Sequence, residues 1–307
     1  MLCGIVEDVL IARSPVGPAL LVALAAVNQE VGAAFAVGLF AAMGALGAVF
    51  ARFLVAGVVL GVAVRPAISG LSSRAWSAVA ALAVSLTAMN VFFYLALTRI
   101  PLGVAVTVEV LGPLALSVMV GRRASAWLWA GLALAGVALL SLTGVRFGRL
   151  DPAGLAFAVG AAVCWAGYII ASSRAAATFS NLDALAIATM FGALAMAPFA
   201  VMSVDWHATL RWEVVGLGVA VGVMSSVIPY SLELISLRHL PPETFAVVTC
   251  LSPVIAALAG WAVLGQHLAL SGYVAIVLVT VASIGAVRST NGRRSPRASL
   301  PWAQAGR

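Results

Sequence analysis

Long apolar runs separated by short polar breaks follow one another along almost the whole chain. A helix needs about 20 apolar residues to cross the hydrocarbon core of a bilayer, and these runs are near that length. We therefore expect roughly ten membrane-spanning helices. Their expected positions are residues 16–37, 44–64, 75–97, 101–121, 126–144, 151–172, 182–202, 213–236, 243–264 and 268–287. The pattern predicts an all-α membrane protein.

A short motif near residue 100 returns later in the chain. Thr98-Arg-Ile-Pro101 is matched by Arg238-His-Leu-Pro241, and Leu111-Gly-Pro113 by Leu251-Ser-Pro253, at a constant offset of 140 residues. The offset predicts two repeats of five spans, and because five is odd the second repeat would be inverted in the membrane. Inverted repeats are typical of secondary transporters, which bind substrate near the midplane between the repeats. The alternative is a chance likeness of two apolar segments.

The chain therefore divides into four parts. We place the first repeat at residues 16–144 and the second at 151–287, between an N-terminal segment 1–15 and a basic tail 288–307. The acidic start argues against a cleaved signal peptide. Short arginine-rich loops stay in the cytoplasm, and twelve arginines fall on the side of both termini against four on the other side. We expect both termini in the cytoplasm.

Composition agrees with this pattern and excludes several functions. The 307 residues are 63% hydrophobic and 9% charged, and the net charge is +7. Because the arginines lie mostly in short loops, we expect no nucleic-acid partner. The three cysteines and three histidines are scattered, so no metal site or disulfide is expected. The sequence has no phosphate-binding or catalytic motif, and we expect neither a cofactor nor enzymatic activity.

Four charged residues interrupt the apolar spans: Glu30, Arg52, Glu109 and Glu233. A charge near the bilayer centre costs several kcal/mol, so each should face a cavity or a partner. An arginine can hold a carboxylate through two hydrogen bonds while a glutamate receives an ammonium group, which suits a zwitterionic amino acid. Glu109, Glu233 and Glu30 are also candidates for proton coupling, since a buried carboxyl group can exchange a proton.

Each of these residues also has a purely structural interpretation. Arg52 could neutralise Glu109 or Glu30 as a buried packing pair, and Glu233 could extend its side chain to the membrane surface. Pro113, Pro229 and Pro253 lie inside predicted spans, where proline removes a backbone hydrogen bond to the residue four positions earlier. We expect helix kinks there, which either bend the helix or expose a carbonyl group to a cavity.

Several stretches resemble a known family, the EamA-type members of the drug/metabolite transporter superfamily, and in particular its inner-membrane threonine/homoserine exporters. The stretches that carry the resemblance are Met89–Tyr94, Ile100–Val106, Glu109–Ala115, Ile228–Ile235 with Leu240-Pro241, Ala162–Ala166, Gln29 and Arg52. The resemblance implies ten helices in two inverted five-helix repeats, a central cavity open alternately to each side, and efflux of small amphipathic metabolites. The matched positions implied to bind substrate are Gln29, Arg52, Asn90, Tyr94, Glu109, Tyr230 and Glu233.

Three features depart from this family's pattern. Ser252-Pro253 stands where such proteins often have Glu-Pro, Gly265-Gln266 stands where they have Gly-Glu, and Glu30 beside Gln29 is unusual. Thr249 also occupies the position that corresponds to Glu109 in the second repeat. We therefore expect a chemically asymmetric site, with Glu109 as the leading acceptor of a proton or ammonium group.

These observations lead to one main hypothesis. The protein is expected to export small neutral amino acids such as threonine or homoserine by proton antiport, in the cytoplasmic membrane of a bacterium. Its partners would be a small-molecule substrate, protons and membrane lipid, and a homodimer is left open. One alternative is a transporter of the same fold for another metabolite or a drug-like cation, such as a purine or a dye. The other is a non-transporting scaffold or a lipid-modifying enzyme.

Overall fold

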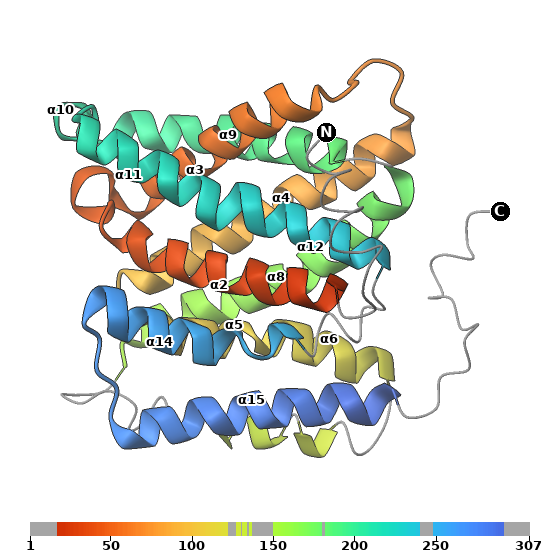
Figure 1. Ribbon diagram of the computed structural model, residues 1–307, viewed down its shortest axis with the longest axis vertical. Coiled ribbons are helices and arrows are strands. Elements are labelled where there is room, and N and C mark those ends of the chain that lie inside the picture. Colours follow the sequence, from red (N-terminus) through yellow and green to blue (C-terminus); the bar gives the residue numbers. More distant parts are fainter. Residues whose placement is uncertain are drawn as a thin grey trace.

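The computed structural model describes residues 17–121, 127–129, 131–133, 135–136, 150–179, 182–239 and 248–291. Helices occupy nearly all of these ranges and run side by side through the molecule (Figure 1). In chain order they are α2 (Gly17–Val37), α3 (Phe40–Val64), α4 (Ser73–Leu97), α5 (Leu102–Glu109), α6 (Leu111–Gly121), α8 (Pro152–Thr178), α9 (Asp183–Ser203), α10 (Trp206–Thr209), α11 (Trp212–Gly222), the π-helix η2 (Val223–Val227), α12 (Ile228–His239), α14 (Ser252–Leu264) and α15 (Leu270–Asn291). The predicted all-α class is confirmed for the described residues.

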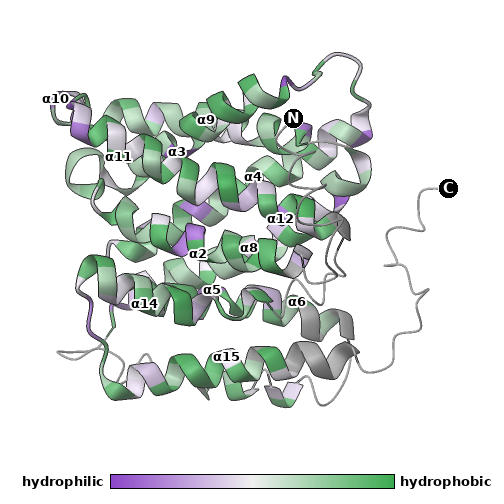
Figure 2. Cartoon of the chain, viewed as in Figure 1, coloured by the Kyte–Doolittle hydropathy of each residue, from purple (hydrophilic) through white to green (hydrophobic). Residues whose placement is uncertain are grey.

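Six helical segments of the described chain are long and apolar enough to cross a membrane: α2, α3, α4, α8, α9 and the continuous run from α11 through η2 to α12. Shorter apolar segments lie in α5–α6, α14 and α15. Large hydrophobic side chains such as Val58, Leu194 and Val219 point outward, and the ribbon is hydrophobic over most of its length (Figure 2). Such a surface is suited to lipid rather than water, and the protein is an integral membrane protein.

The helix boundaries follow local chemistry that the sequence contains. The Ser72 side chain accepts a hydrogen bond from the backbone N–H of Ala75 and starts α4. The Asp151 carboxylate does the same for Ala153 at the start of α8. Within α3 the backbone is interrupted at Gly44, whose φ angle of 66° suits glycine, and this is where the expected second span begins. The helices α2, α3, α4, α5, α8, α9, α11 and α15 start within a few residues of their expected positions, whereas α14 starts at Ser252 and not at residue 243.

Some expected segments cannot be compared with the structure. Segment 1–15, most of the tail 288–307 and most of the expected span 126–144 lie outside the described residues. Residues 240–247, which include the start of the expected span 243–264, lie outside them as well. The count of ten spans therefore stays a prediction.

The helices pack in pairs that join distant parts of the sequence. α4 lies along α8, α3 along α9, α2 along α12, and α5 along α14. Small residues allow these close approaches, which matter in membranes because lipid gives helices little hydrophobic reason to associate. A side chain at Gly32 of α2 would place its Cβ 2.1 Å from Ser225 Oγ, and one at Gly112 of α6 would place it 1.9 Å from the Ala162 carbonyl oxygen. Glycine at these two positions is therefore required by the packing.

Candidate functional site

The charged and polar residues expected inside the membrane converge in the interior of the molecule. They come from separate helices: Glu30 from α2, Arg52 from α3, Asn90 and Tyr94 from α4, Glu109 from the end of α5, and Tyr230 and Glu233 from α12. Each of these side chains is between 0% and 6% exposed. In Figure 2 a hydrophilic stretch interrupts the otherwise hydrophobic ribbon in the middle of α2. We call these seven residues the polar cluster.

Arg52 is bound by neutral groups of the segment η2–α12. Its Nε atom donates a hydrogen bond to Ser226 Oγ at 3.0 Å, and its Nη2 atom donates to the Ser225 carbonyl oxygen and, at 3.3 Å, to the Tyr230 hydroxyl. The guanidinium carbon also lies 5.0 Å from the centre of the Tyr94 ring, a cation–π contact. Arg52 forms no ion pair with any described residue. Arg52 therefore neutralises Glu30 and Glu109, if at all, from a distance and not through a direct ion pair within the described part of the chain.

Pro229 explains why a backbone carbonyl is available to Arg52. Proline has no N–H, so the residue four positions earlier, Ser225, lacks the usual helical donor for its carbonyl oxygen. The backbone widens into the π-helix η2 at this point, a distortion that is frequent at functional sites. The kink expected at Pro229 thus supplies the main-chain acceptor for Arg52.

The other two prolines lie beside helix interruptions. The α5–α6 segment is interrupted at Val110, three residues before Pro113, and α14 starts at Ser252 with Pro253 in its first turn. The first interruption places Glu109 at the end of α5, where its side chain is buried. Thr249 is buried as well, in the corresponding position before α14.

Asn90 and Tyr230 connect α4 with α12 inside the polar cluster. Asn90 Nδ2 donates hydrogen bonds to the Tyr230 hydroxyl at 2.9 Å and to the Leu86 carbonyl oxygen at 2.8 Å. Because Tyr230 also accepts from Arg52, one hydroxyl connects α3, α4 and α12. A change at Tyr230 would consequently disturb three helices together.

The three carboxylates occupy different environments. Glu233 accepts a hydrogen bond from the Tyr168 hydroxyl of α8 at 3.0 Å and is 5% exposed, so the interpretation in which it reaches the membrane surface is wrong. Glu30 lies near enough to Glu109, Arg52 and Glu233 to interact with them electrostatically. One Glu30 oxygen, Oε2, is buried and has no hydrogen-bond partner among the described residues. A buried acceptor without a donor is costly in a membrane, which makes this oxygen a place where a ligand could bind.

Two further residues relate to the sequence predictions. Gln29 is only partly buried, although its Oε1 atom is enclosed and has no partner among the described residues. Gln266, which stands at a position where the family pattern has glutamate, accepts a hydrogen bond from the backbone N–H of Leu102 at 3.0 Å. Gln266 therefore caps the start of α5 and is not part of the polar cluster.

Tyr168, the hydrogen-bond donor to Glu233, is a residue beside the polar cluster that the sequence did not reveal. It lies two positions after the Ala162–Ala166 match, in a span otherwise read as apolar. A hydroxyl group on a buried aromatic ring inside a span was the available signal, because a tyrosine hydroxyl usually finds a hydrogen-bond partner when it is buried.

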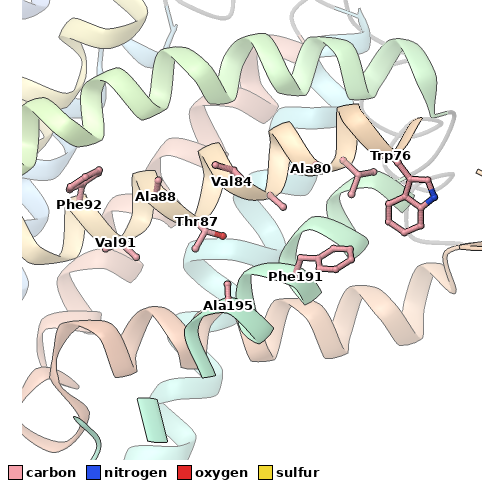
Figure 3. A pocket seen from close by; sticks show the side chains of 11 residues that line it. Trp76, Ala80, Val84, Thr87, Ala88, Val91, Phe92, Phe191 and Ala195 are labelled. Atoms are coloured by element: carbon pink, nitrogen blue, oxygen red, sulfur yellow. The ribbon is translucent and has the colours of Figure 1, made fainter. Parts of the chain in front are cut away.

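An apolar groove of about 540 Å³ lies between α4 and α9 (Figure 3). Its lining side chains include Trp76, Val84 and Phe191, and Thr87 supplies its hydroxyl group. None of the seven residues of the polar cluster lines it. A groove with one hydroxyl and no charge cannot orient a polar solute, so the polar cluster is the better candidate site.

Comparison with known proteins places this architecture in a class. Residues 152–288 match the model of the EamA-like transporter family. The chain is 37% identical over 205 residues to the threonine/homoserine exporter RhtA of Escherichia coli (strain K12), covering 66% of this chain and 68% of that protein. It is also 37% identical over 216 residues to RhtA of Salmonella typhimurium (strain LT2), covering 69% and 71%. The fold and these relatives define a membrane transporter.

More distant comparisons agree with that class. The chain is 28% identical over 215 residues to the uncharacterized transporter YwfM of Bacillus subtilis, covering 67% of this chain and 71% of YwfM. A solved crystal structure matches 89% of this chain and 97% of its own with a TM-score of 0.61 at 20% identity, which shows a common fold. The chain belongs to the EamA-like transporter family, and the resemblance stated from its motifs is confirmed.

Proposed function

We propose that this transporter exports small neutral amino acids such as threonine or homoserine across the inner membrane of a bacterium, in exchange for protons. The observation that carries the proposal is the polar cluster: one arginine and three glutamates are buried among helices of a membrane protein. Buried charges of this kind mark substrate and proton pathways, because their cost must be balanced by a function. The similarity to exporters named for threonine and homoserine supports the substrate class.

We propose further that the fold contains ten spans in two inverted repeats. The helix pairs support this arrangement. The first helix of the first repeat, α2, packs along the third helix of the second repeat, which includes α12, and the third helix of the first repeat, α4, packs along the first helix of the second repeat, α8. α3 pairs with α9, and α5 pairs with α14, as equivalent helices would beside a two-fold axis. Asn90 and Tyr230 are hydrogen-bonded and are 140 residues apart, the same offset as the repeated motifs.

The mechanism that follows is alternating access around the cluster. One half of the molecule rocks against the other, and a central cavity opens first to one side of the membrane and then to the opposite side. Glu109 carries the coupled proton, and its release and uptake alternate with binding and release of the substrate. Glu233 and Glu30 are further candidates for the coupled proton. Both termini lie in the cytoplasm in this scheme.

Reconstituted liposomes with an imposed pH gradient test the proposal. Labelled threonine should move against its gradient when protons flow the other way, and Glu109→Gln should abolish the dependence on pH. Glu213→Gln is the matched control, because Glu213 is an exposed glutamate at the start of α11. Threonine movement that ignores the gradient and survives Glu109→Gln would contradict proton coupling. Failure to move threonine, with movement of a purine or a cationic dye, would contradict the substrate class instead.

A further inference from the structure

We infer that Glu30 is the residue that binds the ammonium group of the substrate, and that the site selects for a primary amine without requiring a carboxylate. The inference rests on the proposed function and names the substrate chemistry of the same site. It extends the substrate class from amino acids to small amines in which the carboxylate is neutralised, such as amino-acid amides.

The first step concerns the hydrogen-bonding capacity of Arg52. A carboxylate held through two hydrogen bonds needs two adjacent N–H groups on one edge of the guanidinium group, and both such edges include Nη2. Nη2 has two N–H groups, and it already donates to the Ser225 carbonyl oxygen and to the Tyr230 hydroxyl. The two-bond clamp expected for a substrate carboxylate is therefore occupied by the protein itself. Arg52 acts as a positioning residue for η2–α12.

The second step concerns the balance of charge. Among the described residues, the buried charged side chains are Glu30, Glu109, Glu233 and Arg52, three acids against one base. A bound carboxylate would add a negative charge to that set, whereas a bound ammonium group would reduce the imbalance. In a region of low dielectric constant such differences are large.

The third step identifies Glu30 among the three acids. Glu233 already accepts a hydrogen bond from Tyr168, but Glu30 Oε2 is buried and has no partner among the described residues. Glu30 is 4% exposed and lies near enough to Glu109, Arg52 and Glu233 for their charges to act on it. An ammonium group offers three donors, and one of them would satisfy this oxygen.

Gln29 precedes Glu30 on α2 and lies on the face of this helix that packs on η2 and α12. Pro18 and Gly32 mark that face, because the Pro18 carbonyl accepts a hydrogen bond from Ser236 and Gly32 contacts Ser225. Gln29 falls between them at helical spacing, and its Oε1 atom is a second enclosed acceptor without a partner among the described residues. Gln29 therefore adds a second enclosed acceptor to α2, next to Glu30 in the sequence.

The experiment compares three ligands with the full-length protein in liposomes and in detergent. Unlabelled L-threonine, L-threoninamide and N-acetyl-L-threonine compete with labelled threonine, and each is also tested for stabilisation of the purified protein against heat. We expect threoninamide to compete at least as well as threonine, and N-acetylthreonine to be roughly 10- to 100-fold weaker, as for a lost hydrogen bond to a charged group.

Two variants separate a binding role from a structural one. Glu30→Gln keeps the shape but removes the charge, and it should lower the affinity for threoninamide roughly 10-fold or more while affecting N-acetylthreonine little. Asn28→Ala is the matched control on the same helix, since Asn28 donates to the Leu24 carbonyl oxygen of its own helix, and it should keep the ligand order.

The outcomes of this experiment distinguish the two proposals. If N-acetylthreonine competes as well as threonine, or if Glu30→Gln leaves the ligand order unchanged, the inference about Glu30 is wrong while threonine transport stands. If threonine does not exchange at all, the proposed function is wrong, and heat stabilisation by threoninamide then decides the inference. The absence of stabilisation by threoninamide would overturn it.

Discussion

Two arginines of this protein occupy opposite environments. Arg99, at the end of α4, donates a hydrogen bond to Asp151 at 2.9 Å, and the two side chains are 47% and 35% exposed. Arg52 is 3% exposed and binds two serines and a tyrosine, none of them charged. The exposed arginine thus has an oppositely charged partner, and the buried one has none among the described residues.

The comparison separates an exposed structural contact from a buried one at the proposed site. An exposed ion pair contributes little to stability, because water already solvates both ions and salt screens them. A buried guanidinium group must be satisfied by hydrogen bonds, and here the protein distorts a helix into η2 to provide them. That distortion is understandable if the charge of Arg52 is needed inside the membrane.

The largest effect is expected from Arg52→Met. This change removes the Arg52 N–H groups that donate to Ser226 Oγ, to the Ser225 carbonyl oxygen and to the Tyr230 hydroxyl. It should reduce the free energy of unfolding by about 3 kcal/mol or more. Threonine exchange should be lost. Arg52→Lys should keep only part of the stability and part of the threonine exchange, since an ammonium group cannot reproduce the planar set of donors.

Thermal unfolding in detergent and exchange in liposomes measure these effects. Arg99→Met is the matched control, because it removes an arginine whose partner is exposed. If the two methionine variants were equally stable and equally active, the distinction between the two arginines would fail.

An intermediate effect is expected at the segment that holds Arg52. In Gly32→Ala the new Cβ would lie 2.1 Å from Ser225 Oγ and 3.1 Å from the Ser225 backbone nitrogen, so the Ser225 side chain must move and the adjoining backbone of η2 must give slightly. We expect a loss of about 1–3 kcal/mol in stability, as for other overpacked positions, together with lower transport.

Gly216→Ala in α11 provides the control for this substitution. Its Cβ would meet nothing within 4 Å, and alanine is favoured over glycine in a helix by up to about 1 kcal/mol. Thermal unfolding and threonine exchange rates are measured for Gly32→Ala and for Gly216→Ala and compared. Equal stabilities would show that the contact between α2 and η2 is not what positions Arg52.

The smallest effect is expected at Asp151, as a dependence on pH. The hydrogen bond from Arg99, and then that from the Ala153 backbone, hold the pKa of the Asp151 carboxyl below its usual range. A lowered pKa in the folded state stabilises the fold above the unfolded value of about 3.9, and this contribution is lost as the pH falls further. Asp151→Asn should therefore reduce the stability slightly at neutral pH and flatten its decline below about pH 4.

Unfolding curves between neutral and acidic pH, for the natural chain and for Asp151→Asn, check this prediction. The natural chain should lose its small advantage only at the acidic end. An advantage that vanished near neutral pH would mean that another group, and not Asp151, controls the pH dependence.

Much of the fold and part of the site could be predicted from the sequence. The apolar runs located α2, α4, α9 and α15 within a few residues, because length and hydrophobicity decide whether a helix crosses a bilayer. Charged residues in those runs identified Glu30, Arg52, Glu109 and Glu233 as candidates, because such residues are too costly to bury without a reason. The family followed from motifs that hold polar residues at fixed spacing.

The partners of those residues could not be predicted. Arg52 was expected to meet a carboxylate, but its contacts lie 173 to 178 residues away, on a segment reshaped by Pro229. The partner of Glu233 is Tyr168, 65 residues earlier and on another helix. Hydrophobic periodicity gives the direction of a side chain on its own helix, but it gives no information about which helix lies opposite.

The sequence by itself therefore determined that this chain is a helical membrane protein, where most of its helices run, and which charges they bury. These properties depend on composition and spacing along one segment at a time. Only the tertiary structure decided that Arg52 is held by neutral groups and that Glu30 keeps an acceptor oxygen without a partner among the described residues. Those properties depend on how α2, α3 and η2 approach one another, which small residues such as Gly32 permit but do not specify.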